Sequence, residues 1–274
     1  MRAIFYMLFL AGLIASSGCK SDQSIKKSLM PAFQSIIDAV DVEGAILIFD
    51  PEEQIYYSNN FEWCSEGRLP ASTFKIPNSI VALETGVMEN DSTLIPWNGK
   101  PSAMQVWEQD LHFYEAFHYS CVPCYQKIAR SVGAERMNAW LQKLAYGHMQ
   151  VNSGNIDRFW LEGRSHINPY EQIDFLKRLY QGELDISEST HQIMKRMLVI
   201  RKTPDYTLSG KTGWSIRNGN NNGWFVGYLE ASGKVYFFAT NISPREDFNM
   251  KLFGKIRKEI TMEAFKKLEL TNPA

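Results

Sequence analysis

The segment PASTFKIP, residues 70–77, stands between strand-like sequence and a long run of helical sequence, and it predicts the start of a helix. Pro70 suits the turn before a helix, and Ser72 and Lys75 are three positions apart, so both side chains lie on one helix face. A serine hydroxyl becomes a good nucleophile when a neighbour takes its proton, and an apolar pocket lowers the pKa of a lysine towards that task. Backbone N–H groups at a helix start also favour a developing oxyanion. The segment therefore predicts a serine nucleophile with Lys75 as its base.

The Ser-x-x-Lys spacing alone is a weak signal. It occurs at Ser17/Lys20, Ser24/Lys27 and Ser72/Lys75. Each pair can be a coincidence on a helix face. Only the third pair is bounded by prolines and set among apolar residues, so support for a site has to come from other segments.

The composition is that of an ordinary globular protein: of 274 residues, 45% are hydrophobic and 22% are charged, and the formal net charge is −1. This length suffices for one large domain or for two subdomains that share a cleft. A nearly neutral chain gives no reason to expect nucleic acid or a polybasic membrane patch as a partner. We interpret residues 24–268 as a single domain, with a sheet lobe at about 24–70 and 201–268 and a helical lobe at about 71–200.

Residues 1–18 read as an export signal, because a short basic start is followed by an apolar stretch, residues 3–14, that is too short to span a bilayer. Gly18 and Cys19 also resemble the end of a bacterial lipoprotein signal, in which the cysteine is lipidated and becomes the mature N-terminus. Ser16 stands where such signals usually carry leucine, so a lipid anchor at Cys19 stays open. We expect an exported, periplasmic protein whose membrane contact, if any, is this anchor.

Three more cysteines follow, at positions 64, 121 and 124. Export makes a disulfide possible, but three thiols cannot all pair within the chain. Cys121 and Cys124 have the spacing of a redox motif, although no thioredoxin-like βαβ pattern surrounds them. We favour the alternative that they are small buried residues near a helix start, and the pairing of Cys64, Cys121 and Cys124 stays open.

Hydrophobic periodicity places strands near both ends of the chain and helices in the middle. Strands are predicted at 45–49, 55–58, 206–214, 224–230 and 234–242, and helices at 24–40, 76–85, 103–110, 122–131, 134–145, 169–180, 187–199 and 248–268. Residues 217–223, rich in Asn and Gly, predict a long hairpin turn. The pattern predicts an α+β fold, in which an antiparallel sheet is flanked by N- and C-terminal helices and an all-helical subdomain is inserted between its strands. A cleft between the two lobes is the expected place for a site.

Four further segments are candidates for that site: 119–123 (YSCVP), 146–148 (YGH), 159–163 (FWLEG) and 209–214 (SGKTGW). Each has an ordinary alternative. A serine at a helix start is usually a cap, a strand often ends in a glycine turn, and aromatic-rich segments are more often core than site.

The order of these motifs is more informative than any one of them. Ser-x-x-Lys comes first, Ser-x-Val follows at Ser120 and Val122, and Lys-Thr-Gly comes last at 211–213. This order resembles that of the serine penicillin-recognising enzymes. The middle motif has the form Ser-Cys-Val, and this form, together with the sequences of residues 146–147 and 156–163, resembles the class D β-lactamases, or oxacillinases. The resemblance covers nearly all of residues 25–268. The resemblance implies a β-lactamase/transpeptidase-like fold and hydrolysis of the β-lactam ring of penicillin-type antibiotics, which confers resistance.

The resemblance implies a role for each matching residue. Ser72 matches the nucleophile that opens the ring to an acyl-enzyme, and Lys75 matches a lysine that reacts with CO₂ to become N6-carboxylysine, the general base. Only a neutral amine attacks CO₂, and a dry pocket keeps the amine neutral. Trp160 matches the indole that donates a hydrogen bond to the carbamate, and Val122 and Leu161 match the apolar residues that cover it. Apart from CO₂ or bicarbonate, no cofactor and no metal is expected.

On the opposite wall, Ser120 matches the proton relay to the leaving nitrogen, and Lys211 matches a lysine that attracts the carboxylate of the drug. The further residues implied in substrate binding are Thr212, Gly213, Trp214 and Arg257. An arginine fork suits a carboxylate, and the backbone N–H groups of Ser72 and Trp214 are expected to form the oxyanion hole.

The chain departs from the family pattern at two positions. His148 stands where the family usually has asparagine, so a role for it in the pH response and a plain exposed position both stay open. Cys121 replaces a small residue, and a buried thiol fits that space. The five histidines show no paired metal-binding spacing, so a metal site is not expected.

Two other functions stay open beside hydrolysis: a penicillin-sensing domain that remains acylated and a D,D-peptidase. The intact set of motifs argues against a third, an inert lipoprotein with a decayed site. The expected partners are small-molecule β-lactams. The sequence does not decide the drug spectrum or between a monomer and a homodimer.

Overall fold

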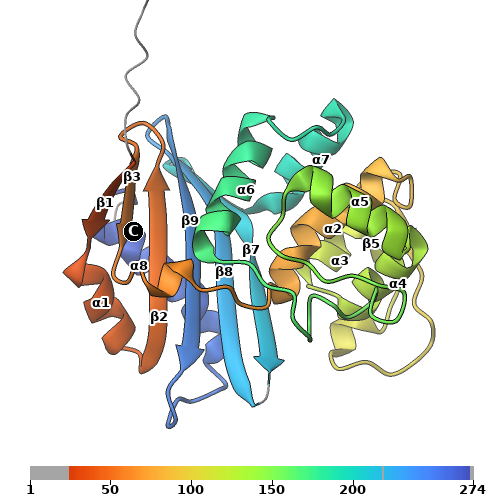
Figure 1. Ribbon diagram of the computed structural model, residues 1–274, viewed down its shortest axis with the longest axis horizontal. Coiled ribbons are helices and arrows are strands. Elements are labelled where there is room, and N and C mark those ends of the chain that lie inside the picture. The colour runs from red at the N-terminus through yellow and green to blue at the C-terminus, as the bar shows by residue number, and fades with distance from the viewer. Residues whose placement is uncertain (1–24, 218, 272–274) are drawn as a thin grey trace, which may run out of the picture.

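Residues 25–217 and 219–271 are described by a computed structural model, in which a seven-stranded sheet separates two layers of helices (Figure 1). The strands are β1 (Lys26–Leu29), β2 (Val42–Asp50), β3 (Ile55–Ser58), β4 (Leu94–Ile95), β5 (Leu111–His112), β6 (Val199–Lys202), β7 (Tyr206–Arg217), β8 (Asn220–Ala231) and β9 (Lys234–Pro244). The α-helices are α1 (Pro31–Asp38), α2 (Lys75–Glu84), α3 (Phe113–His118), α4 (Val122–Val132), α5 (Ala134–Leu144), α6 (Pro169–Gln181), α7 (Glu188–Leu198) and α8 (Phe253–Lys267). Short 3₁₀ turns are η1 (Trp63–Ser65), η2 (Ala71–Phe74) and η3 (Gln105–Trp107).

The large sheet has the strand order β1-β3-β2-β9-β8-β7-β6. Its pairs are antiparallel except for β1 and β3, which run parallel. Both faces are buried around the centre of the sheet. On β2, Ala45 and Leu47 contribute to one apolar cluster and Ile46 and Ile48 to another, because successive side chains point to opposite faces of a strand. The predicted α+β fold is confirmed.

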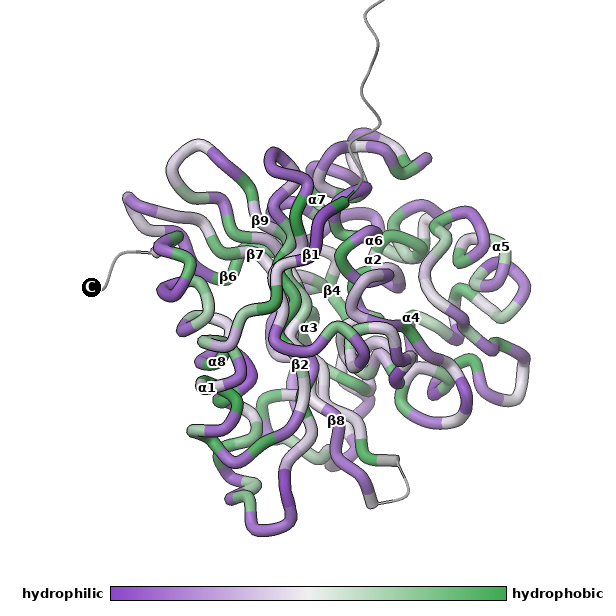
Figure 2. The backbone as a smooth tube through the Cα atoms, turned by 60° about the vertical axis from the view of Figure 1, so that its left-hand side comes forward, coloured by the Kyte–Doolittle hydropathy of each residue, from purple (hydrophilic) through white to green (hydrophobic). Residues whose placement is uncertain are grey.

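Helices α1 and α8 cover one face of the sheet, and α6 with the remaining helices covers the other (Figure 1). The first layer is closed by apolar side chains such as Phe33 of α1 and Phe265 of α8, both fully buried. In the second layer, helices are amphipathic, as the alternating colours along α5 in Figure 2 show. The helical region lies between β3 and β6 in the chain, so it is an insertion between strands of one sheet.

Two predicted helices are wrong. In place of the predicted helix at 24–40, the described residues 25–40 form the edge strand β1 and the shorter α1. Pro31 begins the helix, and the Met30 N–H before it donates to the Ser58 carbonyl (2.8 Å). Residues 103–110 contain only the 3₁₀ turn η3, and their surroundings are loops. Both segments had a helical apolar period, which short irregular segments can match by chance.

Two further boundaries differ from the prediction. Ser72 lies in the 3₁₀ turn η2 rather than in the first turn of an α-helix, and α2 begins at Lys75. The predicted turn at 217–223 is shorter than expected, since the ladder of β7 and β8 continues to the pair Arg217 and Asn220, and residues 220–223 belong to β8. Asn222 has a place in this ladder because its side chain accepts a hydrogen bond from the Asn241 amide (2.7 Å).

The predicted export signal, residues 1–18, and Cys19 lie outside the described residues. Within residues 25–217 and 219–271, no helix combines the length and the apolar character needed to cross a membrane.

We predict that Gly227→Ala destabilises the sheet by about 2–4 kcal/mol. Gly227 pairs directly with Gly210, and an added Cβ would lie 2.0 Å from the Ser209 carbonyl oxygen and 2.7 Å from the Gly210 Cα, neither of which can move without breaking the β7–β8 ladder. The matched control is Gly254→Ala in α8, whose Cβ would meet only the Arg257 Nη2 at 3.9 Å. Urea denaturation of both variants measures the difference; equal losses of stability would contradict the account.

Candidate active site

Ser72, the predicted nucleophile, lies on η2, a tight turn that joins the sheet lobe to α2. The Pro70 carbonyl accepts hydrogen bonds from the backbone N–H (3.1 Å) and the hydroxyl (2.7 Å) of Thr73. Ala71 has a φ of 49°, a left-handed conformation that is rare for residues with a side chain, and its N–H donates to the Trp160 carbonyl (2.9 Å). These bonds fix the bend that presents the Ser72 hydroxyl.

Lys75, the first residue of α2, is fully buried beside this serine. Its Nζ donates a hydrogen bond to Ser72 Oγ (2.9 Å) and lies 5.0 Å from the centre of the Tyr125 ring. Burial, and secondly the positive charge of Lys211, lower the pKa of Lys75 well below its usual value. The lysine therefore favours the neutral amine, which can accept a proton from Ser72 or react with an electrophile.

Trp160 packs next to Phe74, the residue that precedes Lys75. It is fully buried and stacks on Phe74, with 5.4 Å between ring centres. Its indole Nε1 is a buried donor without a hydrogen-bond partner among the described residues. Buried donors are nearly always paired, so this one marks a place for an acceptor. Leu161 packs against the same apolar cluster, and Val122 is a half-buried residue at the start of α4.

Ser120 stands opposite, between the end of α3 and the start of α4, with a φ of 56°. Its Oγ accepts a hydrogen bond from Lys211 Nζ (3.0 Å), which also donates to the Thr212 carbonyl (3.3 Å). Burial, followed by the charges of Arg257 and Lys258, lowers the pKa of Lys211 to about 7. This lysine therefore changes charge near neutral pH.

Arg257 approaches β7 from α8 and is almost fully buried. Its guanidinium donates to the carbonyls of Phe253 and Gly254 (3.1 Å each) on its own helix and to that of Gly213 on β7. Burial lowers the pKa of Arg257 to about 10, which leaves it charged at neutral pH. The Trp214 ring lies over it at 5.9 Å and is partly exposed. The arrangement puts a fixed positive charge beside the Lys-Thr-Gly strand.

Gly213 permits the close contact between β7 and η2. A Cβ there would lie 2.9 Å from the Pro70 carbonyl oxygen and 3.2 Å from the Thr73 nitrogen, both in the turn that holds Ser72. The glycine of the Lys-Thr-Gly motif thus has a structural reason within the chain, in addition to leaving room for a ligand.

The structure brings Ser72, Lys75, Ser120 and Lys211 together through these hydrogen bonds and contacts. A small cavity of about 170 Å³ lies beside Lys211. It is lined by Phe117, His118, Ile200, Gly210, Lys211, Thr212 and Lys258. A larger cavity of about 760 Å³ lies at the opposite end of β7 and β8, around 202–207 and 230–235, and none of the predicted site residues lines it. We assign the chemistry to the side of the small cavity, because two of the predicted site residues, Lys211 and Thr212, line it.

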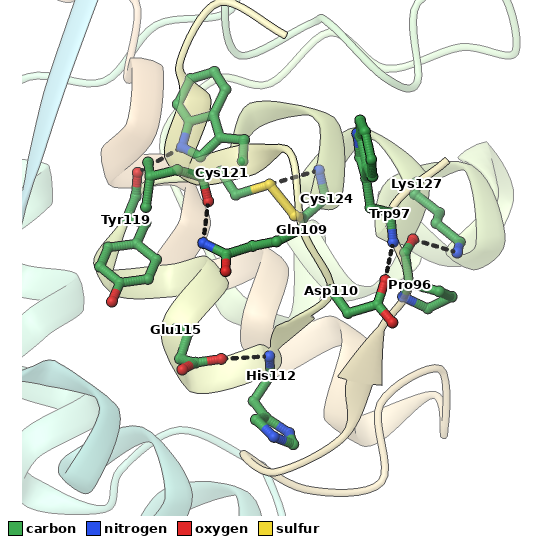
Figure 3. The surroundings of a disulfide bond; sticks show 12 residues. Pro96, Trp97, Gln109, Asp110, His112, Glu115, Tyr119, Cys121, Cys124 and Lys127 are labelled. Atoms are coloured by element: carbon green, nitrogen blue, oxygen red, sulfur yellow. Dashed lines mark hydrogen bonds between the residues drawn. A yellow bond between two sulfur atoms is a disulfide. The ribbon is translucent and has the colours of Figure 1, made fainter. Parts of the chain in front are cut away.

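Cys121 and Cys124 form a disulfide at the start of α4 (Figure 3). Both cysteines are buried at a helix start, as the favoured interpretation expected, but they are bonded to each other, which the sequence left open. Cys64 is the free cysteine among the described residues, and burial raises the pKa of its thiol to about 11.

His148 is exposed and away from these residues: its backbone pairs with His166, and its Nε2 lies 3.5 Å from a Glu171 oxygen. Within the described part of the chain, no cluster of three or more His, Cys, Asp or Glu side chains is arranged to hold a metal ion.

Sequence reasoning missed two buried polar contacts of the site. Tyr125 covers Lys75 with its ring and exchanges a hydrogen bond with Ser79 (2.7 Å). Gln172 of α6 donates to the Thr73 hydroxyl (2.9 Å) and so supports the nucleophile turn from a distant segment. The local sequence around a tyrosine or a glutamine on an amphipathic helix does not indicate such a role. One signal was available for Tyr125, because α4 begins two residues after Ser120 and so places Tyr125 near the site.

Comparison with known proteins agrees with this geometry. The family model of the penicillin-binding protein transpeptidase domain matches residues 44–266, so the chain belongs to that family. Within it, the chain is a member of the class D β-lactamases. It is 40% identical to β-lactamase OXA-10 of Pseudomonas aeruginosa over 80% of this chain and 83% of that one. A class D β-lactamase structure from Sebaldella termitidis is 37% identical and superposes with a TM-score of 0.85, covering 91% of this chain and all of its own. The regulatory protein BlaR1 of Bacillus licheniformis is 28% identical over 88% of this chain but only 41% of its own length.

We predict that Gly213→Ala slows covalent labelling of the protein by a fluorescent penicillin, the reaction that defines the family. The new Cβ pushes on Pro70 and Thr73, so Ser72 moves by a few tenths of an ångström, and a misplaced nucleophile costs up to about 100-fold in rate. Thermal unfolding is the control for general loss of structure. Labelling at the wild-type rate would contradict the role given to this contact.

Proposed function

We propose that this chain hydrolyses the β-lactam ring of penicillin-type antibiotics through an acyl-enzyme on Ser72, with Lys75 carboxylated on its Nζ as the general base. The observation that supports the proposal most is the buried Lys75 amine, 2.9 Å from Ser72 Oγ. Trp160, whose buried indole donor has no partner among the described residues, stacks on the neighbouring Phe74. Membership of the class D β-lactamases points to the same reaction.

The residues present fit a carbamate. A neutral amine reacts with CO₂ to give a carbamate and one proton, and burial favours the neutral form of Lys75. The anion that results needs a hydrogen-bond donor, and Trp160 Nε1 is buried without a partner among the described residues. The carbamate would supply a base that works close to neutral pH. An unmodified amine would be a poorer base there, because it becomes a buried, unsolvated cation when it takes a proton.

The other residues serve the two halves of the reaction. Ser72 Oγ attacks the carbonyl carbon of the ring, the C–N bond breaks, and the nitrogen takes a proton through Ser120, beside Lys211. Water then attacks the ester, which releases the ring-opened acid and returns the proton to Ser72. Overall, one water is consumed. Lys211 and Arg257 provide the positive charge that attracts the carboxylate of the substrate.

A penicillin sensor is the second candidate, because the similarity to BlaR1 extends over most of this chain. A sensor forms the same acyl-enzyme on its serine but keeps it. A D,D-peptidase would instead process a D-Ala-D-Ala peptide and be trapped by penicillin. Repeated turnover of a chromogenic cephalosporin separates hydrolysis from both alternatives.

We further propose that export through residues 1–18 takes the protein to the periplasm, where hydrolysis would protect the cell from the antibiotic. The sequence leaves open both a lipid anchor at Cys19 and the choice between a monomer and a homodimer.

We predict that removal of bicarbonate lowers the rate of penicillin hydrolysis and that its return restores the rate, because Lys75 loses CO₂ reversibly. Lys75→Ala should lower kcat by roughly 10³-fold or more, with no recovery in bicarbonate. Trp160→Phe removes one donor to an anion, a loss of about 1.5 kcal/mol, so it should raise the bicarbonate concentration for half-activation about tenfold. Full turnover by Lys75→Ala protein would contradict the base assignment.

We predict that kcat/KM falls as the pH rises above about 7, since Lys211 then loses the charge that attracts the substrate carboxylate. Towards acid pH the rate should fall as well, because Lys75 becomes protonated and cannot hold CO₂. Lys211→Arg keeps a permanent charge, so its alkaline limb should move up by at least about one pH unit, whatever its absolute rate. An unchanged alkaline limb in this variant would rule out Lys211 as the titrating group.

A further inference from the structure

We propose that the Cys121–Cys124 disulfide is a positioning element of the active site, which holds the first turn of α4 so that Ser120 and Tyr125 stay in contact with the two site lysines. The inference rests on the proposed function and adds a group to it that the reaction itself does not use. It predicts that reduction of this bond lowers catalysis in a folded protein.

The disulfide replaces an ordinary helix cap. Cys121 is the N-cap of α4, a position where a serine, threonine or aspartate oxygen usually accepts the N–H of the third helical residue. Here Cys124 N–H donates to Cys121 Sγ (3.2 Å), and sulfur is a weak acceptor. Pro123 adds no donor to this turn. The covalent S–S bond therefore supplies the restraint that hydrogen bonding supplies in other helices.

The residue before the cap is the one that most needs restraint. Ser120 has a φ of 56°, and a residue with a side chain keeps this conformation only where its surroundings enforce it. On one side, the end of α3 holds the backbone, through bonds from Ser120 N–H to Phe117 O (3.1 Å) and from Cys121 N–H to Ala116 O (2.9 Å). On the other side, the disulfide holds it. The contact at stake is the 3.0 Å hydrogen bond from Lys211 Nζ to Ser120 Oγ.

The residue after the disulfide touches the other lysine. Tyr125 is fully buried, its ring centre lies 5.0 Å from Lys75 Nζ, and its hydroxyl is 2.7 Å from Ser79 Oγ on α2. One turn of helix thus contacts Lys211 through Ser120 and Lys75 through Tyr125, and the S–S bond closes that turn. A loosened turn would disturb both lysines together.

The disulfide is largely buried, but one of its two cysteines is slightly exposed. Cys121 is fully buried and Cys124 is 8% exposed. The segment around Trp97, Gln109 and Tyr119 surrounds them in Figure 3, and the Trp107 indole ties this segment to the Tyr119 carbonyl (2.9 Å). Of the two cysteines, Cys124 is the more exposed, so we expect its sulfur to react with a small dithiol. Its thiolate attacks there, the S–S bond breaks, and Cys121 leaves as a thiolate at a helix N-terminus, which favours that charge. The second thiol of the reagent completes the reduction.

A purely stabilising role predicts a different result. A disulfide that closes so short a loop removes little entropy from the unfolded chain, so its loss should change the melting temperature little. Its effect should appear instead in the readouts tied to the two lysines. These are the pH at which the alkaline limb begins, for Lys211, and the bicarbonate concentration for half-activation, for Lys75.

The test compares oxidised wild-type protein, wild-type protein reduced with dithiothreitol, and the double variant Cys121→Ser/Cys124→Ser, which restores an oxygen cap without a covalent bond. Mass spectrometry after thiol alkylation verifies the redox state of each sample. We expect kcat/KM for penicillin to fall at least about tenfold in the reduced protein and in the double variant, with both lysine readouts shifted and melting temperatures within a few degrees. The double variant should not respond to dithiothreitol.

Cys64→Ser is the matched control, since Cys64 is a buried cysteine away from the disulfide, and it should respond to dithiothreitol as the wild type does. Unchanged activity and unchanged lysine readouts in verified reduced wild-type protein would overturn the proposal, as would an unbonded Cys121 in protein purified without reductant. If oxidised wild-type protein shows no hydrolysis, the proposed function fails first. If it hydrolyses penicillin and reduction has no effect, only the disulfide proposal fails.

Discussion

The site depends on one energetically unfavourable placement: the Lys75 amine is buried beside the Ser72 hydroxyl, and among the described residues it forms no ion pair with a carboxylate. In water, Lys75 would be charged and Ser72 would be inert. Burial favours the neutral form of Lys75, and a neutral amine can take the proton of Ser72 and make its hydroxyl reactive. The placement opposes folding, because between the usual lysine pKa and the lowered one the unfolded chain binds a proton that the native state rejects. Stability therefore falls as the pH falls across that window.

The rest of the fold makes this placement possible. The seven-stranded sheet is covered on both faces, so β7 is rigid where it meets the nucleophile turn through Gly213. Helix α2 starts at Lys75 and is buried over most of its length, which keeps water from the amine. Lys211 and Arg257 add charge on the sheet side of the pocket, and α4 closes it from the helical side with Ser120 and Tyr125. Each wall comes from a different part of the chain, as expected for a cleft between two lobes.

The sequence motifs predict which residues meet at the centre of the candidate site, since the structure pairs Lys75 with Ser72 and Lys211 with Ser120. Ser72 and Lys75 lie within one turn, and Ser120 and the Lys-Thr-Gly strand stand out by residue type and order. The α+β architecture also follows from strands at both ends of the chain and helices between them. Local patterns fail where tertiary contacts decide the outcome. The edge strand β1 forms because β3 pairs with it, although residues 24–40 have a helical period, and the Asn-rich end of β8 stays in the ladder through contacts with β7 and β9. Tyr125 and Gln172 act through packing between distant elements, which spacing does not reveal. The spacing of Cys121 and Cys124 permits a disulfide but does not decide between a bonded pair and two buried thiols.

Acylation and deacylation at Ser72 are tested most directly by time-resolved mass spectrometry of the intact protein during its reaction with penicillin in bicarbonate buffer. We expect one adduct, in which the mass of the protein is increased by that of one penicillin molecule, and peptide digestion should map it to Ser72. It should appear at once, persist while substrate remains, and vanish as ring-opened product accumulates well beyond the amount of enzyme. An adduct on another residue, or one on Ser72 that remains after the drug is exhausted, would contradict it.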